Sequence, residues 1–155
     1  MRAGLGFDAH AFDDKRQLVL GGVVIPDAPG LAGHSDADVV CHAIADALLG
    51  AANLGDLGSH FPNTDEWKGA SSIDILRAVR TMLASGGFEV ASVDATVLIE
   101  APRIARYRDE MRKRIAVALG VDPGVISIKA TTTDGLGTVG RGEGAACMAV
   151  ALVGP

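Results

Sequence analysis

Strand-like and helix-like segments alternate along the whole chain, and this alternation restricts the fold more than any other feature of the sequence. Residues 90–99 alternate apolar side chains with Asp94 and Thr96, a period of two that predicts a strand with one buried face. After Ser71, apolar residues instead recur every three or four positions up to Ser85, which predicts an amphipathic helix. Such alternation predicts an α/β or α+β domain in which helices cover a sheet.

Turn and cap signals supply the remaining boundaries. Gly21 and Gly22 lie between two short apolar runs and predict a hairpin. Ser35 begins an S-x-x-D sequence that ends at Asp38, which predicts a capped helix start. In chain order we expect a strand at 2–8, hairpin strands at 18–20 and 23–25, a loop at 26–33, a helix from about 36 to 52, a long loop at 55–69, the helix that ends at Ser85, the strand at 90–99, a helix after Pro102 that ends before Gly120, and strands at 125–130 and 145–153.

The size and charge of the chain narrow the class of protein. With 155 residues, 48% of them hydrophobic, the chain is long enough for one domain, residues 1–155, with a substantial core. The excess of acidic over basic residues, 19 against 14, argues against a nucleic-acid-binding protein. Cys41 and Cys147 lie among apolar residues, which favours buried free thiols over a disulfide. Without a leader or an apolar run of spanning length, we expect a cytoplasmic protein with no membrane partner.

Asp8, His10 and His42 form a candidate metal site. In a strand, residues 8 and 10 project from the same face, so their carboxylate and imidazole converge. A second imidazole from another element completes three ligands and leaves one position open on a tetrahedral zinc, as in catalytic sites. From spacing alone, a polar loop residue at His10 and a packed helix residue at His42 explain the sequence equally well.

The helix that carries His42 has further polar residues close to this site. Asp46 lies one turn after His42 and is a candidate hydrogen-bond partner for its ring, although a solvated helix residue is an equal alternative. His34 and Ser35 precede the helix, whose free N–H groups favour anions. A plain capping role is the alternative for His34.

A second polar group follows the strand at 125–130. A glycine-rich loop, 135–144, includes Arg141 and follows Thr131, Thr132, Thr133 and Asp134. Hydroxyls and backbone amides bind phosphate oxygens, and a carboxylate binds a hard cation. A strand end followed by a long hairpin is the alternative interpretation of this segment.

Seven short motifs occur in a fixed order along the chain and carry a resemblance to a known family. They lie at residues 6–12, 34–38, 46–51, 55–58, 61–65, 129–133 and 140–144. With these motifs the chain resembles the 2-C-methyl-D-erythritol 2,4-cyclodiphosphate synthase family of the non-mevalonate isoprenoid pathway, over residues 2–153.

The resemblance implies a reaction and an assembly. Such enzymes convert 4-diphosphocytidyl-2-C-methyl-D-erythritol 2-phosphate to the 2,4-cyclodiphosphate and release CMP, as phosphorus–oxygen lyases. Because the 2-phosphate of the substrate attacks its own β-phosphorus, positioning and charge neutralisation carry the catalysis. The resemblance also implies a mixed sheet with helices on one face and a homotrimer with active sites between subunits.

The resemblance further assigns residues to roles. It implies one Zn²⁺ per subunit at Asp8, His10 and His42, and Mg²⁺ or Mn²⁺ at Asp134 together with the substrate diphosphate. His34 and Thr132 would stabilise the transition state. The implied substrate-binding residues are Asp8, His10, His34, Ser35, Asp56, Leu57, Gly58, Phe61, Pro62, Asn63, Thr64, Asp65, Ala101, Pro102, Arg103, Thr131, Thr132, Thr133, Asp134 and Arg141.

Two departures from the family pattern affect these expectations. Asp134 stands where the family usually has Glu, so the reach to the second cation is one methylene shorter and contact through water is an alternative. Thr138 stands where an aromatic residue is common, near a channel on the trimer axis that takes isoprenoid-like ligands in the family. A metal-dependent phosphodiesterase and a non-catalytic trimeric protein that binds a phosphorylated ligand are the alternative functions. Ligand type alone leaves zinc, cobalt and manganese open at the first site.

Overall fold

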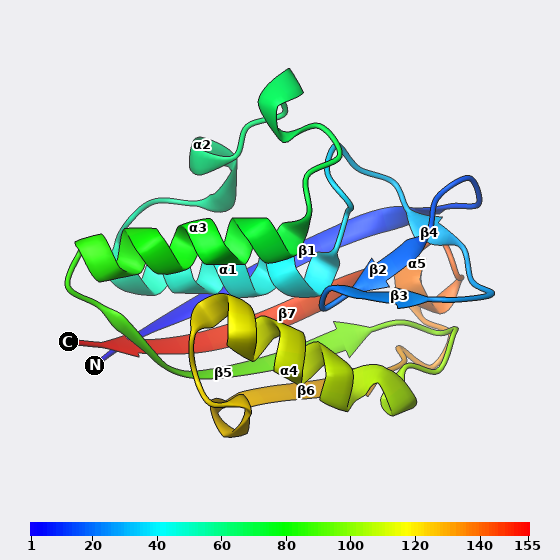
Figure 1. Cartoon of the computed structure of the whole chain (residues 1–155). Helices are drawn as coiled ribbons and strands as arrows, with labels where there is room; N and C mark the ends of the chain where they lie inside the picture. Colours follow the sequence, from blue (N-terminus) through cyan, green and yellow to red (C-terminus); the bar gives the residue numbers. More distant parts are fainter.

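A five-stranded mixed sheet forms the centre of the computed structural model, which describes residues 1–155 (Figure 1). The strand order is β4-β1-β7-β5-β6. β5 and β6 are parallel, and the other neighbours are antiparallel. The strands of this sheet are β1 (Arg2–Asp13), β4 (Gly30–Leu31), β5 (Glu89–Leu98), β6 (Ile126–Thr131) and β7 (Gly144–Gly154), and a separate antiparallel hairpin consists of β2 (Leu18–Leu20) and β3 (Val23–Ile25).

The three long helices lie on one face of the sheet (Figure 1). α1 (Val39–Ala52) packs on β1 and β7, α3 (Ser72–Ser85) packs on α1, and α4 (Arg108–Leu119) contacts α3 and β6. The predicted fold class, a mixed sheet with helices on one face, is therefore confirmed. The short helices are α2 (Leu57–His60) and α5 (Gly137–Gly140), and the 3₁₀ turns are η1 (Asp65–Trp67), η2 (Ala105–Tyr107) and η3 (Pro123–Val125).

Two glycines allow α1 to lie directly on β1. A Cβ added to Gly4 would lie 1.9 Å from the Ala47 carbonyl oxygen, and one added to Gly6 would lie 1.9 Å from the Ala43 carbonyl oxygen. Any side chain at these strand positions would push the helix away. The close approach places His42, at the start of the helix, beside the residues that follow Gly6 on the strand.

Gly6→Ala is expected to destabilise the fold by about 2 kcal/mol, because overpacking a tight contact costs roughly 1–3 kcal/mol. The measurement is the free energy of unfolding from urea denaturation. Gly50→Ala is the matched control: Gly50 lies in α1, and a Cβ there meets no atom within 4 Å. This control should gain about 0.5–1 kcal/mol from helix propensity. Equal effects of the two substitutions would contradict the close packing of α1 on β1.

α1 begins at a buried carboxylate. Its N-cap is Asp38, so the capping role predicted for Ser35 is wrong, as is the helix start near residue 36. Asp38 is fully buried and accepts hydrogen bonds from the backbone N–H groups of Val40 and Cys41, each at 3.1 Å. It also accepts from Gly21 at 2.9 Å and Gly22 at 2.7 Å, in the turn between β2 and β3. Four donors fix this carboxylate, and it ties the hairpin to the start of α1.

Other boundaries also differ from the expectation. β1 continues to Asp13 because Phe12 and Asp13 pair with β4, a two-residue strand within the predicted loop at 26–33. The helix predicted after Pro102 begins only at Arg108, after the η2 turn. The glycine-rich loop contains α5, which packs against β7.

On the face of the sheet opposite the helices, β1 and β7 expose apolar side chains, whereas β5 and β6 carry the exposed ion pair of Asp94 and Lys129. Leu5 and Phe7 on β1 are 65% and 59% exposed, and Met148 and Val150 on β7 are 45% and 46% exposed. Leu5 pairs with Val150 and Phe7 pairs with Met148 in the antiparallel register, so the four side chains form one continuous patch. A patch of this kind in the middle of a sheet is a candidate interaction surface.

Cys41 and Cys147 are buried free thiols, as predicted. Burial raises the pKa of both thiols, because a thiolate is poorly solvated in the core. None of the helices combines the length and the apolar character that a bilayer crossing requires.

Candidate metal centre and adjoining cavity

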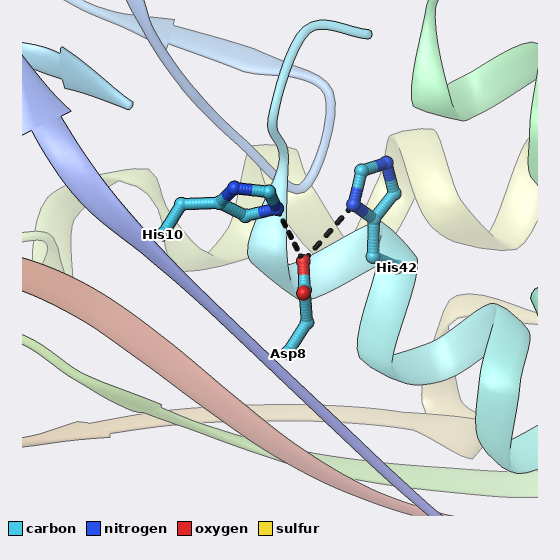
Figure 2. A group of neighbouring side chains, drawn as sticks. All are labelled: Asp8, His10 and His42. Carbon is cyan, nitrogen blue, oxygen red and sulfur yellow. Dashed lines mark hydrogen bonds and ion pairs between the residues drawn. The ribbon is translucent and has the colours of Figure 1, made fainter. Parts of the chain in front are cut away.

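Asp8 and His10 on β1 and His42 on α1 point toward one another (Figure 2). The Asp8 Oδ2 atom lies 3.0 Å from His10 Nε2 and 3.0 Å from His42 Nδ1. One ligand atom from each residue lies within 4.8 Å of the others, so the group can hold a metal ion. The structure thus brings together the three ligands predicted from the sequence.

The electrostatics of this group favour an ionised carboxylate. Burial opposes the charge on Asp8, but the hydrogen bond from His10 and the close contact with His42 outweigh burial and lower the pKa of Asp8 to about 2. The same hydrogen bond to Asp8 raises the pKa of His10, against the opposing effect of burial. A proton and a cation therefore compete for the His10 nitrogen that faces Asp8.

Two serines, rather than Asp46, contact the far side of the His42 ring. His42 Nε2 lies 2.8 Å from Ser72 Oγ and 3.2 Å from Ser35 Oγ. The Asp46 carboxylate instead accepts a hydrogen bond at 3.0 Å from the backbone N–H of Leu57, the first residue of α2. The predicted contact between Asp46 and His42 is wrong, because the two sides of the His42 ring are already occupied.

A cavity of about 190 Å³ opens beside these candidate metal ligands. His34, Ser35 and segments of the long loop after α1 enclose it, together with Trp67 and Ile75, which no motif in the sequence indicated. Trp67 packs edge-on against Phe61, with ring centroids 4.8 Å apart. The lining residues are Asp8, His10, His34, Ser35, His42, Leu57, Gly58, Phe61, Asn63, Trp67 and Ile75.

The other predicted residues of the long loop support this wall from outside the cavity. His34 Nε2 donates to the Thr64 carbonyl oxygen at 2.6 Å, which fixes the loop that contains Pro62 and Asp65. Asp56 caps α2 by accepting from the Ser59 hydroxyl and backbone N–H at 2.6 and 2.8 Å. The hydroxyl contact is the main cause of the lowered pKa of Asp56.

Arg16 anchors the segment that carries Ser35, and no sequence motif pointed to it. Its guanidinium donates hydrogen bonds to the carbonyl oxygens of Gly33 and Ser35. These contacts join the end of β1 to the chain that leads into α1. Because the partners are backbone atoms 17 and 19 residues away, no local sequence signal marks this arginine.

The predicted nucleotide-binding residues form a second group outside the cavity lining. The Glu100 carboxylate accepts from the Thr133 backbone N–H at 2.7 Å and from its hydroxyl at 3.2 Å, which joins the threonine segment to the loop at 101–103. The Thr132 hydroxyl lies 3.3 Å from Asp134 Oδ1, and Arg141 pairs with Glu143 at 3.0 Å. None of the residues Ala101, Pro102, Arg103, Thr131, Thr132, Thr133, Asp134 and Arg141 lines the metal-site cavity of the same chain.

Comparison with known protein families shows that residues 1–154 match the model of the YgbB family. The chain belongs to the YgbB family. A protein of Chlorobium phaeobacteroides named 2-C-methyl-D-erythritol 2,4-cyclodiphosphate synthase is 54% identical over 154 residues, which cover 99% of this chain and 98% of that protein. The resemblance stated from the seven motifs is therefore confirmed.

Solved structures of related proteins share the fold. The bifunctional IspDF of Campylobacter jejuni superposes with a TM-score of 0.94 at 40% identity, and the match covers 98% of this chain and 42% of that chain. A structure described as the CDP complex of IspF from Plasmodium falciparum has a TM-score of 0.86 at 32% identity, with 99% and 96% of the two chains covered. The chain thus corresponds to a whole single-function relative and to one part of a bifunctional one.

Proposed function

We propose that this YgbB-family chain is a 2-C-methyl-D-erythritol 2,4-cyclodiphosphate synthase. On this proposal it converts 4-diphosphocytidyl-2-C-methyl-D-erythritol 2-phosphate to the cyclic diphosphate and CMP, as a phosphorus–oxygen lyase of the cytoplasm. The observation that carries the proposal is the convergence of Asp8, His10 and His42 at the wall of a cavity. The high identity to proteins named for this reaction supports it.

The donor set fits zinc. Two imidazole nitrogens and one carboxylate oxygen are ligands that zinc accepts, and three protein ligands leave a position for substrate. When bound, the ion would supply Lewis-acid polarisation of a phosphoryl oxygen. The role of the chain is to keep Asp8 ionised and to aim His10 and His42 at the same point.

The cavity residues position the methylerythritol phosphate in this proposal. Ser35, Leu57, Gly58 and Asn63 surround the substrate phosphate and carbon chain, while the Phe61–Trp67 pair excludes water from that end. Exclusion of water matters because hydrolysis of the same diphosphate would compete with cyclisation. His34 lies beside the reacting phosphates and stabilises their developing charge.

A second copy of the chain completes the site in this proposal. The threonine segment, the loop at 101–103, Asp134 and Arg141 lie outside the metal-site cavity of their own chain, so the cytidine diphosphate half comes from a neighbour. The uncovered patch of Leu5, Phe7, Met148 and Val150 supports a homotrimer built on this sheet face. The Plasmodium falciparum structure, described as a CDP complex, supports a cytidine nucleotide ligand.

Phe7→Glu is expected to dissociate the trimer, because a carboxylate in the centre of an apolar interface loses its hydration without gaining a partner. Light scattering should give three times the chain mass for the unmodified protein and one chain mass for the variant. Cyclisation should be lost with the trimer. A stable monomer of the unmodified protein at micromolar concentration would contradict the shared active site.

We expect the protein to retain its zinc ion much more firmly than its magnesium or manganese ion. A dialysed, substrate-free protein should keep about one zinc per chain, because all three ligands come from the protein. The second cation has one protein carboxylate, Asp134, so magnesium or manganese should bind only with the diphosphate present.

Asp134→Ala should therefore raise the magnesium concentration needed for turnover and leave the zinc content unchanged, whereas Asp134→Glu should preserve the requirement. Metal analysis and a magnesium titration of the rate measure both effects. Loss of zinc from Asp134→Ala would place Asp134 among the ligands of the first site.

A substrate analogue that lacks the 2-phosphate tests the proposed function. The 2-phosphate is the nucleophile, so the analogue should bind and release no CMP, while the full substrate releases one CMP per molecule. A phosphodiesterase that uses metal-bound water would cleave both compounds. A binding protein without catalysis would cleave neither.

A further inference from the structure

On its Nε2 side, the His42 ring contacts Ser72, and Ser72 in turn forms hydrogen bonds with Asp36. We propose that Asp36 and Ser72 fix the proton of His42 on Nε2 and so reserve Nδ1 for the metal ion. The proposal rests on the metal site of the proposed function. It assigns a positioning role to two residues that contact neither metal nor substrate.

Ser72 is placed for this role by the start of α3. It is the first residue of the helix and is fully buried. Its hydroxyl donates a hydrogen bond to Asp36 Oδ1 and lies 2.8 Å from His42 Nε2. Its backbone N–H also donates to Asp36 Oδ2, at 2.8 Å.

The number of available protons decides which atom donates in each of these hydrogen bonds. Asp36 receives the Ser72 hydroxyl, the Ser72 backbone N–H and the Asp38 backbone N–H, so it acts only as an acceptor. A serine hydroxyl has a single proton, and here that proton goes to Asp36. The Ser72 oxygen can then only accept from His42, which requires a proton on Nε2.

The opposite nitrogen consequently presents a lone pair to the metal site. In a neutral imidazole with Nε2 protonated, Nδ1 is an acceptor. Nδ1 lies 3.0 Å from Asp8 Oδ2, so two electron-pair donors face each other. Only a cation or an additional proton makes this arrangement favourable, and the metal ion supplies the positive charge. Such orienting contacts behind a metal-bound histidine typically contribute about 10–100-fold to metal affinity.

Asp36→Asn is the sharpest test because it reverses donor and acceptor in the hydrogen bonds from residue 36 to His42. The amide oxygen is expected to remain on the Ser72 backbone N–H, the shorter of the two backbone contacts, at 2.8 Å against 3.2 Å for Asp38. The amide NH₂ group then donates to the Ser72 oxygen, and the Ser72 hydroxyl donates to His42 Nε2. This drives the proton to Nδ1, the nitrogen that must bind the metal.

The probe is cobalt alone, titrated into the metal-free full-length protein and followed by its visible absorption, while nitrogen NMR of the metal-free protein before the titration gives the protonation of His42. We expect protonated Nε2 in the unmodified protein and protonated Nδ1 in Asp36→Asn, with cobalt affinity about 10–100-fold weaker. Ser72→Ala should weaken affinity within the same range, because only the longer Ser35 contact remains. Ser72→Thr, which keeps the hydroxyl, should restore it.

Ser85→Ala is the matched control, since Ser85 is an exposed serine at the opposite end of α3 that bonds to the Thr81 carbonyl oxygen. It should leave cobalt affinity unchanged. Equal cobalt affinity and an unchanged His42 tautomer in folded Asp36→Asn and Ser72→Ala would overturn the proposal. If one of the two variants does not fold, the other decides. Failure of the unmodified protein to bind cobalt would instead overturn the metal site of the proposed function.

Discussion

His42→Ala is expected to lose the bound metal and the catalytic activity together. Asp8 and His10 would remain, and two protein ligands hold zinc poorly. Loss of the ion removes Lewis-acid stabilisation worth several kcal/mol, so turnover should fall by a factor on the order of 1,000 or more. Metal analysis of the purified variant, together with its rate of CMP release, measures the effect.

Asp46→Asn is the control for this substitution, because Asp46 lies one turn further along α1 and contacts Leu57 instead of His42. An asparagine oxygen can accept the same hydrogen bond, so zinc content and turnover should stay close to those of the unmodified protein. A His42→Ala protein that retains one zinc per chain would contradict the ligand assignment.

Asp38→Ala is expected to have the largest effect on stability. It leaves four backbone N–H groups at the junction of the β2–β3 turn and α1 without their acceptor. Each buried donor left unpaired costs roughly 1–3 kcal/mol, and partial rearrangement reduces the sum, so we expect a loss of about 3–5 kcal/mol. Urea denaturation gives the free energy of unfolding.

Asp74→Ala is the comparison for Asp38→Ala, since Asp74 also lies at a helix start but is exposed and paired only with Arg77. Its loss should stay within about 0.5 kcal/mol. A similar small loss for Asp38→Ala would show that the buried carboxylate does not hold the hairpin to α1. Because His42 follows Asp38 by four residues, the destabilised variant should also bind zinc more weakly.

The period of two along β1 was enough to place Asp8 and His10 on one face of the sheet. Local patterns also located α3, through its apolar stripe, and α1, which is apolar on nearly all sides. The meeting of His42 with this pair depends on the close packing of α1 on Gly4 and Gly6, which only the structure shows. From the sequence, only the family resemblance joined His42 to Asp8 and His10. The spacing of the residues left this contact undecided.

The errors share a physical cause. Ser35 has the residue type of a cap, but Asp38 takes the role because its carboxylate also receives two N–H groups from a hairpin 16 and 17 residues away. Asp46 has the helical spacing of a partner for His42, but Ser72, 30 residues away in sequence, reaches the ring through the packing of α3 on α1. Local patterns contain no information about such tertiary contacts.

The most direct test of the central claim, cyclisation by the substrate's own phosphate, is phosphorus NMR of the products formed in water labelled with heavy oxygen. The reaction forms a bond from a 2-phosphate oxygen to the β-phosphorus and breaks the bond to the CMP oxygen, so no water oxygen enters either product. We expect unlabelled cyclic diphosphate and unlabelled CMP in equal amounts. An uncyclised 2,4-bisphosphate that contains heavy oxygen, or CMP that contains it, would show hydrolysis and contradict the account.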